Sequence, residues 1–290
     1  MKTLILALPG AEDFAQNLAA RLGCEAGAVE VRRFADGEQL VRLRTSVSGC
    51  RVLLAAQLDH PDEKTLPAIF AADAARELGA TEVGLIAPYL PYMRQDARFR
   101  EGEAVTARSY ARLLSGAFDF LVCVGPHLHR IGDLREIYRI PTQVVSPAPA
   151  IADWLARTAP DCILVGSKRA TWVGEIAAAA RVPFVLLETS QDGARPALPA
   201  ASSAAGRTPV LVEDIATTGD SLIAGAQALR AAGWGTPVAV VVHALLQQED
   251  VQALHHAGVP RIAACNTVAH PASVIPVDDA LAEAVRAFCA

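Results

Sequence analysis

Short apolar runs alternate with helical patterns along almost the whole chain, and this rhythm restricts the fold more than any other feature. The runs at residues 4–8, 52–56 and 83–87 predict buried strands. The stretches at residues 12–22 and 65–78 between them predict helices. Alternation of this kind predicts mostly parallel sheets covered by helices on both faces. We therefore predict an α/β fold.

The proline-rich stretch at residues 146–149 interrupts this rhythm near the middle of the chain. A length of 290 residues is enough for about two domains of ordinary size. We therefore predict two similar α/β domains, residues 1–146 and residues 147–290. The other expected strands cover residues 39–43, 120–124, 143–145, 162–165, 184–187, 210–212, 237–242 and 261–264. The other expected helices cover residues 104–115, 150–156, 171–180, 250–257 and a terminal segment from residue 279.

Composition and charge argue against several classes of protein. Hydrophobic residues make up 52% of the chain, which permits a large core. No apolar run approaches the roughly 20 residues that a membrane helix needs, so we expect no membrane association. The net charge of −5 and the lack of a long basic run argue against nucleic acid as a main partner. The first residues are read as a strand rather than a signal peptide.

The cysteine pattern indicates a reducing compartment. The six cysteines are scattered along the chain without a CxxC pair. Cys123 and Cys162 lie inside apolar runs, and both are predicted to be buried thiols. A cytoplasmic location is the setting that fits this usage.

The richest candidate site is residues 213–221, which we call the acid–hydroxyl loop. An expected strand precedes it, and a helical pattern follows it to about residue 232. Glu213 and Asp214 come first, followed by a turn of hydroxyl side chains around Gly219. Free backbone N–H groups at a helix start, together with the helix dipole, favour a bound phosphate.

Two readings of this loop are open. In the first, the hydroxyls add donors for a phosphate, Gly219 lets the backbone approach closely, and the acid pair accepts hydrogen bonds from sugar hydroxyls. Such a site suits a ribose 5-phosphate. In the second, the loop is an ordinary strand-to-helix turn with Asp220 or Ser221 as the helix cap. Two adjacent acids directly after a buried strand favour the first reading.

The hairpin turn, as we call residues 33–38, combines a glycine with acids and an aromatic side chain. Gly37 lies between Asp36 and Glu38, and a strand-like run follows these residues. A plain turn between two strands explains the glycine and the acids. It explains the nearby Phe34 less well.

The arginine loop, residues 88–100, follows the expected strand at residues 83–87. Open α/β sheets bind ligands at the carboxyl ends of their strands, so this loop is a candidate site. Arg94, Arg98 and Arg100 bring three guanidinium groups into it, and such groups suit phosphate oxygens. The alternative is a solvated loop with internal salt bridges.

The histidine loop, residues 124–129, begins at the end of another expected strand. Its side chains His127 and His129 can ligate a metal or contact a phosphate. Two histidines rarely suffice as a metal site, so the pair taken alone also fits surface histidines.

In this order, these three stretches and the acid–hydroxyl loop resemble the ribose-phosphate diphosphokinase family. The resemblance extends over nearly the whole chain and implies two tandem domains of the type I phosphoribosyltransferase fold. It implies ATP-binding motifs in the N-terminal domain and the ribose 5-phosphate loop in the C-terminal domain. The ATP-binding residues implied are Phe34, Asp36, Glu38, Arg94, Gln95 and Asp96. The ribose 5-phosphate-binding residues implied are Glu213, Asp214, Thr217, Thr218, Gly219 and Ser221.

The resemblance also implies an activity. Members of the family transfer the β,γ-diphosphoryl group of ATP to the 1-hydroxyl of ribose 5-phosphate, giving phosphoribosyl diphosphate and AMP. The implied cofactor is Mg²⁺, and His127 is implied as a catalytic residue and as the metal ligand, near the triphosphate. A homo-oligomer, dimer or hexamer, is implied because the family's adenine-binding turn often reaches into a neighbouring subunit.

Three departures from the family pattern bear on catalysis. The aspartate of the family's Asp-Leu-His motif is Gly125 here, and Ser167 stands where the next metal-site aspartate is expected. The family's mobile catalytic loop carries a lysine and an arginine, whereas residues 188–195 contain no lysine. Arg195 and Lys168 are the candidates to replace that catalytic cation.

These departures leave a second function open, a catalytically impaired homologue that acts as a regulatory subunit binding nucleotide or sugar phosphate. A third function is a phosphoribosyltransferase that consumes the diphosphate. The tandem halves and the adenine-type turn argue against this third function. Release of AMP that depends on ribose 5-phosphate distinguishes the first function from the other two.

Overall fold

The computed structural model describes residues 2–167, 172–187 and 206–289. The chain divides into two compact units, which are described separately. Unit 1 comprises Met1–Val145 and Asp278–Ala290, and unit 2 comprises Ser146–Val277. Each unit is a mostly parallel sheet flanked by helices, so the predicted α/β fold is confirmed.

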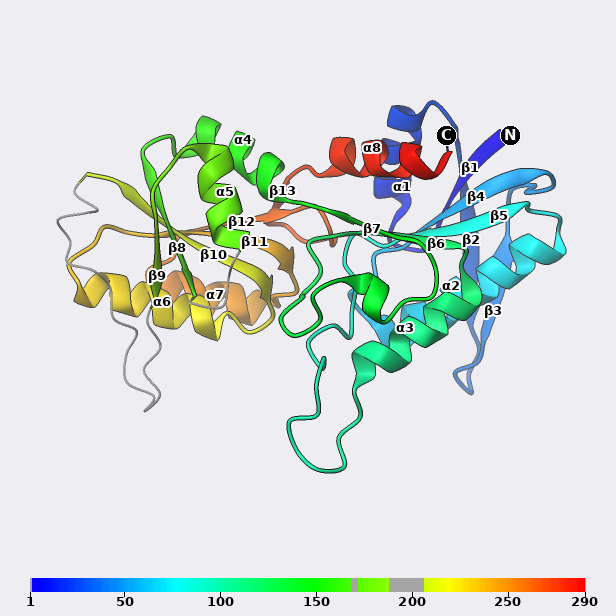
Figure 1. The fold of residues 1–290 in the computed structure, drawn as a ribbon, viewed down its shortest axis with the longest axis horizontal. Helices are drawn as coiled ribbons and strands as arrows, with labels where there is room; N and C mark the ends of the chain where they lie inside the picture. The colour runs from blue at the N-terminus through cyan, green and yellow to red at the C-terminus, as the bar shows by residue number, and fades with distance from the viewer. Residues whose placement is uncertain (1, 168–171, 188–205, 290) are drawn as a thin grey trace. The chain divides into compact units, whose positions relative to one another are not determined.

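Unit 1 is built on a seven-stranded sheet in the order β3-β2-β1-β4-β5-β6-β7. Neighbouring strands run parallel except for the antiparallel pair β2 and β3. Helices α1 and α8 lie on one face of the sheet, and α2 and α3 lie on the other (Figure 1). The strands are β1 Lys2–Ala7, β2 Glu25–Arg33, β3 Gln39–Leu43, β4 Cys50–Ala55, β5 Glu82–Ile86, β6 Phe120–Val124 and β7 Thr142–Val145. The helices are α1 Glu12–Leu22, α2 Pro61–Glu77, α3 Thr106–Ala117, the short 3₁₀ helix η1 Leu134–Glu136, and α8 Asp278–Cys289.

Unit 2 has a six-stranded sheet in the order β13-β12-β11-β10-β8-β9, and all of its neighbouring strands run parallel. Helices α4 and α5 cover one face, and α6 and α7 cover the other (Figure 1). The strands are β8 Cys162–Ser167, β9 Phe184–Leu187, β10 Thr208–Ala216, β11 Val238–Ala244, β12 Arg261–Cys265 and β13 Ser273–Ile275. The helices are α4 Ala148–Thr158, α5 Trp172–Ala180, α6 Asp220–Ala231 and α7 Gln248–His256.

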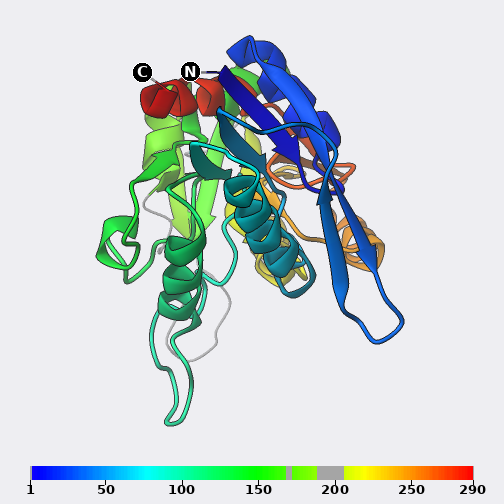
Figure 2. The same cartoon turned by 90° about the vertical axis from the view of Figure 1, so that its right-hand side faces the viewer.

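Strand β2 was not expected from the sequence, because it has no apolar run. Its first half pairs with β1, and its second half pairs with β3 in a hairpin that projects from the sheet (Figure 2). Most of its side chains are exposed or half-buried, since only Val29 is fully buried. Backbone pairing rather than burial therefore forms this strand. The predicted hairpin at residues 33–38 is confirmed.

Helix α8 packs in unit 1, whereas the predicted second domain of residues 147–290 included it. It contacts α1, β6 and β7, and Leu281 and Val285 are completely buried. The Phe288 ring stacks on Phe120 of β6 with 4.4 Å between ring centroids. An apolar stripe shows that a helix must be buried, but it does not specify which sheet it covers.

The two predicted buried thiols are confirmed. Cys123 on β6 and Cys162 on β8 are both fully inaccessible to solvent, and burial raises the pKa of each thiol. The cysteines whose environment is described, including these two, are free thiols rather than disulfides. None of the helices in the described ranges combines the length and apolar character that a bilayer crossing requires.

Candidate functional site

The three candidate stretches of unit 1 lie at one edge of its sheet. The arginine loop follows β5, the histidine loop begins at the end of β6, and the hairpin turn follows β2. These strands are part of a row of parallel neighbours in the sheet, in the order β2, β1, β4, β5 and β6. Their carboxyl ends therefore point the same way, toward the edge where open α/β sheets bind ligands.

The hairpin turn presents an aromatic ring and two acids at an exposed tip. The Phe34 N–H donates to the Glu38 carbonyl at 2.8 Å, and the Glu38 N–H donates to the Asp36 carboxylate at 3.1 Å. Gly37 has φ +97°, a conformation that other residues rarely adopt. The Phe34 ring is 43% exposed and carries the Arg32 guanidinium 4.8 Å from its centroid. This turn thus offers an accessible stacking surface.

The three residues of the arginine loop that are predicted to contact ATP differ in exposure and in hydrogen bonding. Arg94 is exposed. The Gln95 side chain is half-buried and donates to the Glu103 carboxylate at 3.0 Å. The Asp96 side chain is only 1% exposed and forms an ion pair with Arg130 at 2.9 Å. The geometry therefore leaves Arg94 available to a ligand, and it does not support the predicted contact between Asp96 and ATP, since burial hides that carboxylate.

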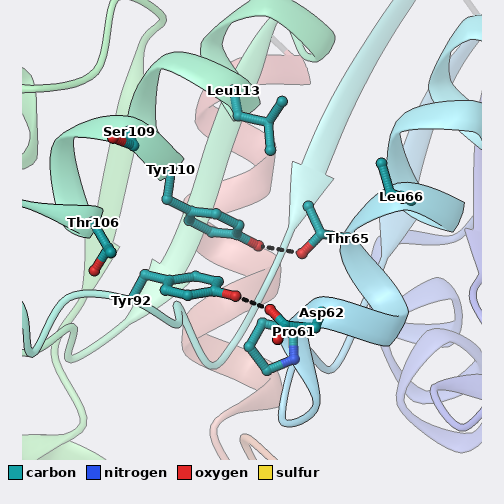
Figure 3. Close-up of a pocket in the computed structure, with 9 residues that line it drawn as sticks. All are labelled: Pro61, Asp62, Thr65, Leu66, Tyr92, Thr106, Ser109, Tyr110 and Leu113. Atoms are coloured by element: carbon teal, nitrogen blue, oxygen red, sulfur yellow. Dashed lines mark hydrogen bonds between the residues drawn. The ribbon is translucent and has the colours of Figure 1, made fainter. Parts of the chain in front are cut away.

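Tyr92 anchors the arginine loop to helix α2. Its hydroxyl donates to the Asp62 carboxylate, while Tyr110 of α3 makes a parallel hydrogen bond of 3.0 Å to Thr65 (Figure 3). The two tyrosine rings lie 4.8 Å apart and line a cavity of about 310 Å³. The hydrogen bond to Asp62, together with partial burial, raises the pKa of Tyr92 to about 12.

The backbone of Tyr92 is under strain. Its φ of +63° lies in the left-handed region, which side chains other than glycine rarely occupy. Strain of this kind persists only where the surroundings hold it, and it gathers at functional positions. Tyr92 is two residues before Arg94, so its anchored conformation sets the direction in which the chain presents that guanidinium.

The histidine loop begins at a glycine with positive φ. Gly125 has φ +41°, and its N–H donates to the Val145 carbonyl at 3.0 Å. This conformation suits glycine better than the aspartate that the family pattern places there. The His127 and His129 rings stack with 3.8 Å between centroids. Two imidazoles thus lie at the carboxyl edge of the unit 1 sheet.

The acid pair of unit 2 lies inside a strand, whereas the sequence predicted that the strand ends before it, at Val212. Strand β10 extends to Ala216, and Glu213 pairs in register with Val241 of β11. The strand continues past its apolar run because β11 supplies partners for its backbone as far as Ala216. Both carboxylates are half-buried, and one Asp214 oxygen accepts from the Ile215 N–H at 2.9 Å. Adjacent strand residues point to opposite faces of a sheet, so the two acids lie on opposite sides of β10.

The rest of the acid–hydroxyl loop leads directly into helix α6. Gly219 is the residue before the helix, with φ +75°, and no side chain caps the helix there. Asp220 and Ser221 are instead inside the first turn, so the alternative in which one of them caps the helix is wrong. Thr218 donates to the Asp220 carboxylate at 2.8 Å. The N-terminal N–H groups of α6 therefore have no side-chain cap competing with a ligand.

Replacing Gly219 with alanine is expected to weaken the ribose 5-phosphate binding that the resemblance implies by about tenfold, because a relaxed loop must return to a left-handed φ that costs a non-glycine residue about 1–2 kcal/mol. The new Cβ would also lie 3.0 Å from the Leu254 side chain. Gly233 is the matched control, because it has φ +74° and open space around its Cβ position. Isothermal calorimetry measures both variants. Equal affinities for the two would contradict a special role for Gly219.

Two predicted catalytic residues, Lys168 and Arg195, lie outside the described residues. Ser167 is the last residue of β8. The sequence did not identify Arg130 or Glu103 as functional. Glu103 accepts hydrogen bonds from the Phe99 and Arg100 N–H groups at 2.9 and 3.0 Å, so it shapes the arginine loop. The signal that could have found it is an acid close in sequence to three arginines.

Comparisons with known proteins agree on one family. Residues 3–117 match the family model of the N-terminal domain of ribose phosphate pyrophosphokinase. The chain is 35% identical over 289 residues to a ribose-phosphate pyrophosphokinase of Methanopyrus kandleri, covering 98% of each chain. It is 28% identical over 296 residues to that of Methanothermobacter thermautotrophicus, covering 98% of this chain and all of the relative. The crystal structure of phosphoribosylpyrophosphate synthetase from Mycobacterium smegmatis has the same fold, with a TM-score of 0.84 and 23% identity over 99% of each chain.

Proposed function

Since this chain belongs to the ribose-phosphate pyrophosphokinase family, we propose that it transfers the diphosphate of ATP to the 1-hydroxyl of ribose 5-phosphate. The products are phosphoribosyl diphosphate and AMP. The observation that carries this proposal is identity of 35% along almost the whole of both chains, which includes the regions of both substrate motifs. The family membership gives no support to the transferase alternative.

In this proposal unit 1 binds ATP. The exposed Phe34 ring stacks on the adenine, and the acids Asp36 and Glu38 of the same turn accept hydrogen bonds from its amino group or from the ribose. The Arg94 guanidinium binds phosphate oxygens in the bidentate manner that its fork favours. Gln95 supports this loop through Glu103.

Unit 2 binds ribose 5-phosphate in this proposal. Glu213 and Asp214 accept hydrogen bonds from ring hydroxyls, and charged acceptors make such bonds stronger than neutral ones. The N–H groups that follow Gly219 bind the 5-phosphate at the start of α6, where the helix dipole adds attraction. The hydroxyls of Thr217, Thr218 and Ser221 supply further donors. The 1-hydroxyl then attacks the β-phosphorus in line, and positioning provides much of the catalysis.

Magnesium fits only part of the residue set. Mg²⁺ takes oxygen ligands and keeps several waters, so the carboxylates of Glu213 and Asp214 are the residues that would hold it. His127, the predicted metal ligand, offers nitrogen, which suits other metals better. When bound with ATP, Mg²⁺ would neutralise charge on the phosphate oxygens. In this proposal His127 instead donates a hydrogen bond to the triphosphate.

The remaining expectations accompany this proposal. Arg195 and Lys168 are the proposed replacements for the missing catalytic lysine. A homo-oligomer is the proposed assembly, since the hairpin turn projects from the unit 1 sheet and its exposed Phe34 ring could reach a second copy (Figure 2). The cytoplasm is the proposed location, because the described cysteines are free thiols, which suit a reducing setting.

The direct test is release of AMP from ATP in the presence of ribose 5-phosphate and millimolar Mg²⁺. We expect turnover that disappears when ribose 5-phosphate is left out. Binding of either substrate by calorimetry without any turnover would overturn the proposal and establish the regulatory alternative. Release of ADP instead of AMP would show phosphate rather than diphosphate transfer, and would also overturn it.

A further inference from the structure

The most completely buried carboxylate at the edge of unit 1 binds one residue at two points. Asp96 of the arginine loop accepts from the Arg130 guanidinium at 2.9 Å and from the Arg130 backbone N–H at 3.1 Å. The Asp96 side chain is 1% exposed, whereas that of Arg130 is 50% exposed. Arg130 is the residue directly after the histidine loop. One aspartate therefore holds both the side chain and the main chain of Arg130.

Arg130 also contacts the arginine loop at a second place. Its guanidinium lies 4.8 Å from the centroid of the Phe99 ring. Phe99 is in turn held by Glu103, which accepts from its N–H at 2.9 Å. A planar guanidinium can pair with a carboxylate at its edge and lie over a ring with its face, which an ammonium cannot do. Arg130 thus connects the histidine loop to the arginine loop through two residues of the latter, Asp96 and Phe99.

The residues held in this way are those that the proposed function needs in fixed positions. Arg94 is two residues before Asp96, and His127 is three residues before Arg130. The two loops follow neighbouring strands β5 and β6, and the contacts of Arg130 with Asp96 and Phe99 connect one loop to the other. A misplacement of about 1 Å at a reacting group can cost about 100-fold in rate.

We propose that Arg130 is a positioning residue, which fixes His127 relative to Arg94 through the buried Asp96 and the Phe99 ring. This inference rests on the proposed function. It also gives Asp96 a role as the support of the arginine loop in place of the ATP contact that the sequence suggested. Neither residue touches the substrate in this assignment.

The test measures AMP release for Arg130→Gln, Arg130→Lys, Asp96→Asn and the double variant Arg130→Gln with Asp96→Asn. For Arg130→Gln we expect kcat to fall by about 10- to 100-fold and the KM for ATP to rise. The KM for ribose 5-phosphate should not change, because its loop is in unit 2. Arg130→Lys should recover part of the loss, since it keeps the charge but not the contact with the ring.

The double variant separates support from direct ATP contact. If Asp96 acts through Arg130, the double variant should lose no more than the worse of the two single variants. Losses that multiply would mean that Asp96 contacts ATP independently, and would overturn the inference. So would wild-type kcat and KM for ATP in Arg130→Gln.

Two controls keep the outcome clear. Arg135→Gln removes an exposed arginine that pairs with Asp133 nearby, and it should leave both constants unchanged. Thermal unfolding of each variant identifies loss of folded protein, which lowers the apparent kcat but does not raise the KM for ATP. If the wild-type chain releases no AMP, the proposed function fails. The inference is then tested by calorimetry of ATP, where equal affinities of wild type and Arg130→Gln would overturn it.

Discussion

Replacing Asp214 with alanine is expected to reduce kcat/KM for ribose 5-phosphate by at least about 100-fold, which corresponds to about 2.7 kcal/mol. A hydrogen bond to a charged acceptor contributes about 1.5–3 kcal/mol, and the carboxylate can accept from more than one sugar hydroxyl. The KM for ATP should rise by a smaller factor, because the ATP motifs are in unit 1 and Asp214 would reach ATP only through Mg²⁺. Steady-state AMP release with each substrate varied in turn measures both effects.

The Asp214 experiment has two useful companions. Asp214→Asn keeps an oxygen that can accept from the Ile215 N–H, so its fold is preserved while the charge is removed. Asp161→Ala is the matched control, because Asp161 is exposed and precedes β8 at the opposite edge of the same sheet. Full activity in Asp214→Ala would show that the ribose 5-phosphate site is assigned incorrectly, even if the chain proves to be a diphosphokinase.

Replacing Gly84 with alanine is expected to destabilise unit 1 by about 3 kcal/mol, the upper part of the usual range for overpacking a core. Gly84 lies on β5 in register with Phe120 of β6, and its added Cβ would overlap the Phe120 ring. That ring cannot easily withdraw, because it stacks on Phe288 of α8. The melting temperature of the first unfolding transition should fall by about 6–12 °C. Differential scanning calorimetry measures this shift.

A second substitution tests the cause of this destabilisation. Phe120→Leu in the Gly84→Ala background should recover part of the lost stability, although the same change alone is destabilising. Gly116→Ala is the control in the same unit, since nothing lies within 4 Å of its Cβ position and alanine favours a helix. If Gly84→Ala has the same melting temperature as the wild type, then α8 does not hold Phe120 in place as the structure indicates.

All the apolar runs predicted as strands overlap strands of the structure, and some elements were predictable at the level of single residues. Helix Glu12–Leu22 and strands Phe120–Val124 and Phe184–Leu187 were expected with the limits that the structure has. The helix shows periodic burial, and the two strands were recognised from short apolar runs with turn residues beside them. Strand β2 was missed for the opposite reason, since its pairing with β1 and β3 involves the backbone and leaves little periodic trace in the side chains.

The sequence predicted which residues lie near the candidate site better than it predicted what each of them does. The sequence placed Arg94 and His127 after strands and Phe34 before one, and the structure puts all three loops at one edge of the unit 1 sheet. Asp96 shows where this reasoning stops. The family resemblance implied a contact with ATP, but its partner, Arg130, is 34 residues away along the chain. A sequence pattern does not reveal whether an acid faces a ligand or a distant cation.

The sequence by itself determined the α/β class, most of the strands and helices, and the residue types available to bind a sugar phosphate and a nucleotide. Local patterns suffice for these, because periodic burial and turn chemistry depend on neighbours in the chain. Only the tertiary structure decided that α8 covers the sheet of unit 1, that the acid pair lies within β10, and that Asp96 is buried against Arg130. Each of these depends on contacts between segments that are far apart in the sequence. Several segments of the chain could cover the same apolar face or pair with the same charged residue, and the sequence pattern does not show which one does.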